Sequence, residues 1–408
     1  MSSKIRVGII GLSVSSKATN WGGTAHVPYL LSDQGKKHYE IVALCNTSVE
    51  SGKKSIKEYK LPSTTATYAS PSDLAKDPNV DLVVNVTGVQ HHYDALLPIV
   101  EAGKNVYTEL PLASNMEQVK DLVSRAEQKG VKTAFGMQGQ TLPLTALLKD
   151  VIGQGKIGKV LSSTWTGAAG PFSEKPEPVG NKYMLERKTG ANMMSVWFLH
   201  CKLHIPSVRV LEAPTYLYAR LTLPSPAINY ICAALGEVDT FHSILGNQRP
   251  SVNLTDDSGK VVDTTQKDTP DQIMFTGRLT NGTLLSYHLR GGAPFPNQPG
   301  VVWSIYGEKG EIRITNPMAL LDIVPAGIKI EMQVFGQEGV QELKVGEDEM
   351  AGLEHPCQNV GRIYEAFARG EVGTWPDWRL ALKRHELMEE MWRRSDGEGA
   401  FGEGVRGM

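Results

Sequence analysis

The feature that most constrains the fold is a series of short apolar runs, each followed by a helix-like segment, over the first third of the chain. The runs are Arg6–Leu12, Glu40–Cys45, Val80–Val86, Lys104–Leu112 and Thr133–Gly136. Continuous apolar runs of this length are typical of strands covered on both faces, and parallel strands need a crossover helix between them. The pattern therefore predicts an α/β fold whose N-terminal domain is a doubly wound parallel sheet.

The pattern changes after Gln140. A helix is expected over 143–153, and the segments that follow alternate apolar with polar residues, as in a sheet with one exposed face. These segments are Leu161–Thr166, Tyr216–Leu223, Ile273–Leu279, Thr283–Leu289, Val301–Tyr306, Ile312–Thr315 and Ile328–Val334. They predict a large, mostly antiparallel open sheet. Two C-terminal helices, Cys357–Ala368 and Trp378–Arg394, are expected to pack back on the earlier layers, and the polar stretch Val252–Asp268 to be mobile.

Composition excludes several classes of function. The 408 residues carry a formal net charge of -2, which gives no broad basic surface for nucleic acid or an anionic membrane. No apolar run is long enough to cross a bilayer, and Met1–Arg6 leads directly into a strand, so no signal or transit peptide is expected. Four cysteines lack metal-ligand spacing and are interpreted as reduced thiols of a cytoplasmic protein.

The loop after the first run has a partial phosphate-binding pattern. In a dinucleotide-binding fold, glycines at this place let the backbone approach a pyrophosphate at a helix N-terminus. Here the G-x-G-x-x-G template is filled by Gly11, Ser13 and Ser16. Such a loop could still bind phosphate through the hydroxyls of Ser13, Ser15 and Ser16, with Lys17 as a point charge. A plain strand–loop–helix connection is the alternative.

The end of the second run bears on the choice of cofactor. Chains that prefer NAD usually have an acid there for the ribose 2′-hydroxyl. This chain has Asn46, Thr47 and Ser48, which do not repel a 2′-phosphate, so the sequence leans towards NADP over NAD. A site that accepts either cofactor, or none, is the alternative. Residues 1–137 are therefore predicted to form an NAD(P)-binding Rossmann domain.

A Glu-x-Pro turn, formed by Glu109, Leu110 and Pro111, follows the fourth strand. Ligands of open parallel sheets bind beyond the carboxyl ends of the strands, so this turn and the loop over Thr87–His92 should face one crevice. A nicotinamide-dependent enzyme could carry its proton donor at the middle position of the turn. Leu110 cannot move a proton, so any remaining chemistry must take its proton from elsewhere.

The order of a nucleotide-type domain, a Glu-x-Pro turn, an alternating sheet and returning helices resembles the glucose–fructose oxidoreductase / inositol dehydrogenase (Gfo/Idh/MocA) family of NAD(P)-dependent enzymes. The resemblance covers nearly the whole chain. Members carry Glu-Lys-Pro where this chain has Leu110 in the middle, and His92 also fits the family pattern. The resemblance implies an α+β domain for substrate binding and oligomerisation over 138–395, followed by a flexible tail at 396–408.

Within that family the chain is most similar to the fungal branch that includes the yeast galactose-regulon repressor. That branch has also lost the lysine of the turn. The matching motifs occur in the same order in this chain: Trp21 with His26 and Pro28, Val89-Gln90-His91-His92-Tyr93, Met137-Gln138-Gly139, Gln154–Gly158, Pro270-Asp271 and Arg290-Gly291-Gly292.

The resemblance implies a set of site residues. Enzymatic members carry an acid and a histidine four residues apart on a helix, where this chain has Val196 and His200. His200 could perform general acid/base catalysis, with Tyr183 and Lys182 as further proton donors. The implied substrate contacts are Trp165, Trp197 and Arg290. The implied cofactor contacts, beyond the residues after the first two runs, are Trp21, Thr87, Val89, His92, Glu109, Leu110, Pro111 and Gln138. A core, loop or strand-end role is the alternative for each.

Two functions remain open on the sequence. The first is hydride transfer between NAD(P) and a small carbonyl or alcohol, or a non-redox isomerase or lyase derivative of the fold. The second is a catalytically silent NAD(P)-binding transcriptional regulator that binds a protein partner and could be nuclear. We favour the enzyme, because the substrate-side loops are rich in polar and aromatic groups. A homodimer or higher homo-oligomer is expected, with no direct nucleic-acid or membrane partner and no metal.

Overall fold

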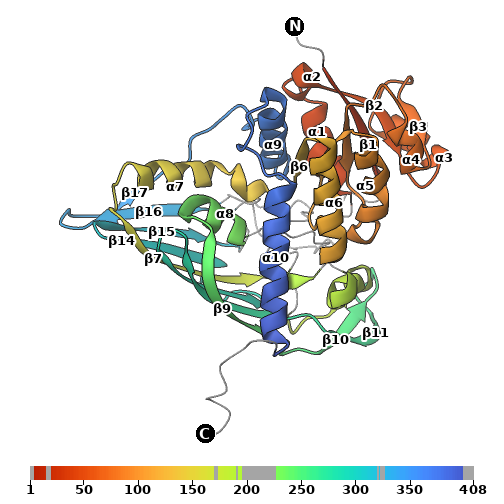
Figure 1. Ribbon diagram of the computed structural model, residues 1–408. Coiled ribbons are helices and arrows are strands. Elements are labelled where there is room, and N and C mark those ends of the chain that lie inside the picture. The colour runs from red at the N-terminus through yellow and green to blue at the C-terminus, as the bar shows by residue number, and fades with distance from the viewer. Residues whose placement is uncertain are drawn as a thin grey trace.

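An all-parallel sheet of six strands forms the N-terminal part of the protein (Figure 1). The computed structural model describes residues 4–14, 20–169, 173–189, 192–194, 227–318, 321 and 327–397. The strand order is β3-β2-β1-β4-β5-β6, and every pair is parallel. The strands are β1 (Ile5–Ile10), β2 (Tyr39–Cys45), β3 (Ala66–Tyr68), β4 (Leu82–Asn85), β5 (Asn105–Thr108) and β6 (Thr133–Phe135). The predicted doubly wound parallel sheet is confirmed, and its strand order reverses between β1 and β4.

Helices cover both faces of this sheet. They are α1 (Val27–Leu30), α2 (Gly35–His38), α3 (Val49–Glu58), α4 (Pro71–Ala75), α5 (His92–Glu101) and α6 (Met116–Lys129), with a 3-10 turn η2 (Val89–His91) before α5. Side chains cap α3, α4 and α6 at their first turns, where Ser48, Ser70 and Asn115 accept backbone hydrogen bonds. Gly130 ends α6 with a left-handed φ of 64°.

The segment between the first loop and β2 is not one continuous helix. A π-helical turn, η1 (Gly22–His26), runs into α1, and a further turn separates α1 from α2. The backbone at Gly35 packs closely on α1, because a Cβ built there would lie 2.0 Å from the carbonyl oxygen of Tyr29. The chain therefore turns after α1 instead of continuing as a helix.

A larger mixed sheet of eight strands follows, in the order β17-β16-β15-β14-β7-β13-β12-β9. Only the β13–β7 pair is parallel, so the predicted mostly antiparallel sheet is confirmed. Exposed and buried side chains alternate along it, and Ile244, Met274 and Leu284 lie on its open face. Its strands are β7 (Val160–Ala169), β9 (Val238–Gly246), β12 (Gln272–Leu279), β13 (Leu284–Gly291), β14 (Val301–Gly307), β15 (Gly310–Asn316), β16 (Lys329–Val334) and β17 (Gln341–Glu342).

The polar stretch predicted to be mobile instead forms a hairpin. Strands β10 (Ser251–Thr255) and β11 (Val261–Gln266) pair antiparallel, and β8 (Glu177–Pro178) completes a three-stranded sheet. The Asp256 carboxylate accepts from the backbone N–H groups of Ser258 and Lys260, which closes the turn. Val252 and Leu254 are buried and the residues between and around them are more exposed, an alternation that is typical of a strand.

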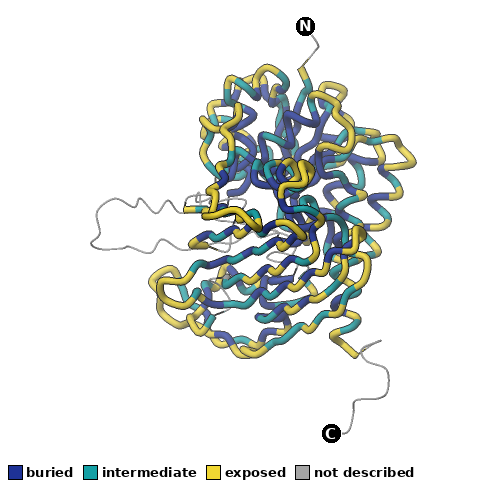
Figure 2. The backbone as a smooth tube through the Cα atoms, turned by 90° about the vertical axis from the view of Figure 1, so that its left-hand side faces the viewer, coloured by how far each residue is buried: buried dark blue, intermediate teal, exposed yellow. Residues whose placement is uncertain are grey.

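Further helices connect and cover the two main sheets. They are the 3-10 turns η3 (Gln138–Gln140), η4 (Val179–Leu185) and η5 (Arg187–Thr189), and the α-helices α7 (Pro143–Gly153), α8 (Ala227–Leu235), α9 (Cys357–Arg369) and α10 (Trp378–Ser395). Helix α10 runs between α6 and the large sheet, and α9 lies beside α1 (Figure 1). Buried residues fill the interior of both parts, whereas exposed ones mark the outer loops (Figure 2). The predicted Tyr216–Leu223 strand lies outside the described residues.

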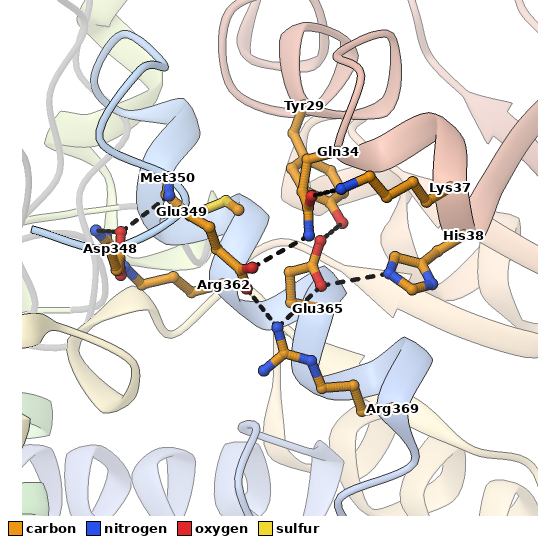
Figure 3. A network of polar contacts seen from close by, with 10 residues as sticks. All are labelled: Tyr29, Gln34, Lys37, His38, Asp348, Glu349, Met350, Arg362, Glu365 and Arg369. Atoms are coloured by element: carbon orange, nitrogen blue, oxygen red, sulfur yellow. Dashed lines mark hydrogen bonds and ion pairs between the residues drawn. The ribbon is translucent and has the colours of Figure 1, made fainter.

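Helix α9 joins the N-terminal domain through a polar network around Glu365 (Figure 3). The Glu365 carboxylate accepts hydrogen bonds from Tyr29 at 2.7 Å and from Arg369 at 3.2 Å, and lies 3.5 Å from the imidazole of His38. Burial and the bond to Glu365 raise the pKa of Tyr29, which keeps its hydroxyl a donor. The network ties α1 and α2 to α9. We keep residue 137 as the proposed domain boundary, because it lies between β6 and α7.

No helix among the described residues has the length and apolar character that crossing a membrane requires.

Candidate cofactor site

The loops that leave β1 and β4 meet at the carboxyl edge of the parallel sheet. Gly11 has a φ of +90°, and a Cβ built there would lie 2.7 Å from the Cγ2 atom of Thr87. Only glycine fits both the backbone angle and this close approach. The Thr87 hydroxyl donates to Asn85 at 2.9 Å, which fixes the start of the second loop. This edge is where open parallel sheets bind their ligands.

The start of the loop after β1 is held by two side chains that the sequence did not single out. The backbone oxygen of Ser13 accepts hydrogen bonds from the Asn20 amide at 2.7 Å and from the Tyr59 hydroxyl at 2.9 Å. The other end of the Asn20 amide accepts from the N–H of Gly23 at 3.0 Å. Among the predicted cofactor contacts, Trp21 is buried in the core beside this loop. Ser15, Ser16 and Lys17 lie outside the described residues.

Three predicted cofactor contacts follow β2. Asn46 is buried, and its amide nitrogen donates to the carbonyl of Leu12 at 2.7 Å, while its amide oxygen has no hydrogen-bond partner among the described residues. Thr47 is exposed. Ser48 is the N-cap of α3, accepting from the backbone of Ser51 at 3.1 Å. Of the three, Asn46 therefore presents a buried acceptor that needs a partner.

His92 links the two loops that were expected to share one crevice. It is buried, with Nδ1 2.8 Å from the backbone oxygen of Pro111 and Nε2 3.0 Å from that of Thr87. Val89 is buried at the start of η2. The structure thus brings the Thr87–His92 loop and the Glu-x-Pro turn together, and it gives His92 contacts that hold these loops in place.

The Glu109 side chain faces the protein interior. Its Oε1 atom lies 3.0 Å from Nε2 of His26, and Nδ1 of the same imidazole lies 2.9 Å from the hydroxyl of Tyr364 on α9. The rings of Tyr107 and Tyr364 enclose this histidine. Burial is the main reason that the pKa values of both tyrosines lie well above their ordinary range. This chain of carboxylate, imidazole and phenol groups fastens the turn to helix α9.

The side chain of Leu110 is buried too. It is 3% exposed and packs in the apolar core of the N-terminal domain, as does Leu112. The N–H of Leu112 donates to Nε2 of His385 on α10 at 3.1 Å. Burial, with the nearby His92, lowers the pKa of His385 to about 4, so its Nε2 remains an acceptor at neutral pH. Three buried histidines, from η1, α5 and α10, therefore hold the turn.

Gln138 lies just beyond the carboxyl end of β6. It is fully buried, and within the part of the chain that the structure describes neither the nitrogen nor the oxygen of its side-chain amide has a hydrogen-bond partner. A buried amide in this state is unusual and calls for a polar ligand or water. With the unpartnered oxygen of Asn46, it gives the carboxyl edge two polar groups that suit the ribose and carboxamide groups of a nicotinamide dinucleotide.

The candidate residues of the second domain occupy different settings. Lys182 on η4 forms an exposed ion pair with Asp263 of β11 at 3.2 Å, and Tyr183 is 39% exposed. The Arg290 guanidinium donates to the carbonyls of Gly291 and Ala293, at 3.1 and 2.9 Å. It therefore fixes the turn after β13. Val196, Trp197 and His200 lie outside the described residues.

Trp165 belongs to the core of the second domain, not to an open pocket. It is 1% exposed, stacks on Tyr287 and donates from its indole nitrogen to the hydroxyl of Tyr230 on α8 at 2.8 Å. Its inward position on β7 follows from the strand alternation, which places it between the sheet and α8. Among the residues that the structure describes, no cluster of three or more His, Cys, Asp or Glu side chains could hold a metal ion.

Comparison with known proteins agrees with this arrangement. Residues 5–137 match the NAD-binding Rossmann-fold model of the Gfo/Idh/MocA oxidoreductase family. Residues 143–206 and 222–316 match the model of the Gal80p C-terminal domain.

Individual relatives extend the similarity over most of the chain. It is 28% identical to the dehydrogenase aclE of Aspergillus oryzae, over 90% of this chain and 94% of that protein. It is 25% identical to the galactose/lactose metabolism regulatory protein GAL80 of Saccharomyces cerevisiae, over 78% of this chain and 68% of the relative. A crystal structure of a super-repressor mutant of that Gal80p superposes with a TM-score of 0.80 at 21% identity, covering 97% of each chain. The chain therefore combines a Rossmann domain of the Gfo/Idh/MocA oxidoreductase family with a C-terminal domain of the Gal80p type.

Proposed function

We propose that this protein is an NAD(P)-dependent oxidoreductase that transfers hydride between its cofactor and a small carbonyl or alcohol. The observation that carries the proposal is the carboxyl edge of the parallel sheet, where Gly11 and Thr87 meet and where Asn46 and Gln138 present unpartnered polar groups. End-to-end similarity to a dehydrogenase supports turnover in addition to binding.

Several of the predicted cofactor contacts have a specific part in this proposal. The loop with Gly11 and Ser13, continued by 15–17, would receive the pyrophosphate, and Asn46 with Thr47 the adenosine ribose. Thr87 and Gln138 would lie at the nicotinamide end. Bound NAD(P) supplies the hydride chemistry, and the protein positions the substrate and moves the proton.

The proton must come from a residue other than Leu110, whose side chain is apolar and buried. Lys182 is engaged with Asp263 on the surface, which makes it the weakest of the three candidates. We therefore rank His200 first and Tyr183 second as the proton donor, because the sequence matches the family pattern at His200. A general acid of this kind contributes about 10²–10⁴-fold to the rate.

Further parts of the proposal concern the substrate side and the assembly. Trp197 and Arg290 are proposed substrate contacts, although the guanidinium already serves two carbonyls of its own turn. The open face of the large sheet, which carries Ile244, Met274 and Leu284, is proposed to pair with a second copy. We propose a cytoplasmic location.

A second function has its own support. The burial of Leu110 and the similarity to GAL80 favour an NAD(P)-binding regulator that performs no turnover and acts through a protein partner. Such a regulator would bind the cofactor in the same crevice and could be nuclear. The two proposals agree on binding and differ on hydride transfer.

Hydride transfer decides between them. Purified protein with NADH or NADPH is incubated with a panel of aldehydes and ketones and with a deproteinised metabolite extract, while absorbance at the nicotinamide band is recorded. The enzyme proposal expects cofactor oxidation that falls about 10²–10⁴-fold in His200→Asn and is unchanged in Lys182→Ala. Saturable cofactor binding without oxidation in any mixture would overturn the enzyme and support the regulator.

A further inference from the structure

The side-chain amide of Asn46 has its orientation fixed by its neighbours. The residue follows β2 directly, and its backbone N–H donates to the carbonyl of Tyr68 at 3.1 Å. Its side chain lies 2.7 Å from the carbonyl oxygen of Leu12, which can only accept, so the NH2 group must face that oxygen. Hydrogen-bond logic therefore decides which end of the amide is nitrogen.

A serine from α3 reinforces this orientation. The Ser55 hydroxyl donates its proton to the same Leu12 carbonyl at 2.7 Å. The Ser55 oxygen is then left as an acceptor, 3.2 Å from the Asn46 amide nitrogen. Both protons of the amide can thus be used inside the protein. Its oxygen is buried and accepts from no group among the described residues, so it remains an acceptor that can take a donor.

From this we infer that Asn46 makes the site selective for NAD over NADP; the inference rests on the proposed cofactor site. A ribose 2′-hydroxyl can donate to the Asn46 oxygen. A 2′-phosphate presents acceptor oxygens and negative charge, so it would set acceptor against acceptor. The sequence-based lean towards NADP rests on side chains that do not repel a 2′-phosphate, with Lys53 and Lys54 further on. It could not include the direction in which the amide points.

In the described part of the chain, the polar groups that follow Asn46 are otherwise engaged or exposed. Ser48 is engaged as the cap of α3, and Thr47 is exposed. Lys53 and Lys54 are the nearby cations on α3, and both are exposed at its solvent side. Besides Lys17, which lies outside the described residues, they are the cations that could contact a 2′-phosphate if the inference were wrong, which makes them useful in the test.

Equilibrium titrations with NADH and NADPH, followed by nicotinamide fluorescence, test the inference. Wild-type protein should bind NADH about tenfold more tightly or better, the ratio that one net hydrogen bond provides. Asn46→Ala should weaken NADH and bring the two dissociation constants close together. Ser55→Ala removes the hydroxyl that accepts from the Asn46 amide, so it should shift the ratio in the same direction as Asn46→Ala but by less.

Three results would overturn the inference, and they differ from failure of the proposed function. Tighter binding of NADPH than NADH, especially if Lys53→Ala or Lys54→Ala abolishes it, would show that the helix cations select the phosphate. An unchanged ratio in Asn46→Ala, or a larger change in Ser55→Ala than in Asn46→Ala, would reduce Asn46 to a structural role. Absence of binding by both cofactors would instead remove the cofactor site itself.

Discussion

Replacing His26 with alanine should weaken the attachment of the Glu109 turn to α9. The imidazole is fully buried and makes two contacts, 3.0 Å to the Glu109 carboxyl group and 2.9 Å to the Tyr364 hydroxyl. A buried hydrogen bond to a carboxylate contributes about 1.5–3 kcal/mol, and one to a neutral hydroxyl about 0.5–1.5 kcal/mol. With the lost ring contacts to Tyr107 and Tyr364, the expected loss of stability is about 3–5 kcal/mol.

Thermal unfolding followed by circular dichroism measures this loss. A change of this size should lower Tm by about 3.5–6 °C if the 408 residues unfold as one unit, at about 2.1 cal/mol/K of unfolding entropy per residue. The matched control is His38→Ala. His38 is one-third exposed and its contact with Glu365 is long, at 3.5 Å, so its loss should cost under about 1 kcal/mol. If the Tm of His26→Ala equals that of His38→Ala and lies within about 2 °C of wild type, the buried contacts from Glu109 to Tyr364 do not hold the turn.

Further predictions concern the turn and the C-terminal helix. Leu110→Lys would bury an ammonium group, so it should lower stability by about 3 kcal/mol or more without creating dehydrogenase activity, whereas Leu110→Met should cost under about 1.5 kcal/mol in urea unfolding. The folded pKa of His385, about 4, lies below the unfolded value of about 6.5. The contribution of His385 to the free energy of unfolding is therefore complete above pH 6.5, and about 3 kcal/mol of it is lost as the pH falls towards 4. His385→Gln should flatten this dependence in profiles of Tm against pH. His91→Gln, at an exposed position, should leave it unchanged. Arg384→Ala removes a buried guanidinium that donates to Glu237 at 2.6 and 2.9 Å and to Asn229, so it should cost about 3–5 kcal/mol, against under about 1 kcal/mol for exposed Arg379→Ala.

The architecture could be predicted because it depends on local patterns. Continuous apolar runs such as Leu82–Asn85 identify parallel strands, and alternation along Gln272–Leu279 identifies a half-exposed one. The hairpin at β10 and β11 was missed because its polar residues outnumber its two buried ones. The turn chemistry of Asp256 and Gly259 was the signal that could have revealed it.

The contacts within the candidate site could not be predicted, because they join residues far apart in the chain. His26 meets Tyr364 on the last third of the sequence, and His385 reaches the turn from α10. The sequence identified Leu110 as unable to move a proton. The packing of its side chain into the core depends on contacts with distant elements, and the sequence pattern does not predict those contacts.

Calorimetric titration with NADH tests the central claim, that the Gly11 edge of the parallel sheet binds a nicotinamide dinucleotide, most directly. The account predicts saturable binding by wild type, and its loss in Gly11→Ala, whose Cβ would collide with Thr87. Gly103→Ala is the matched control, because Gly103 also has a positive φ, of 73°, but open space around it, so that variant should bind as wild type does. No heat of binding at about 1 mM NADH, or equal affinity in both glycine variants, would contradict the claim.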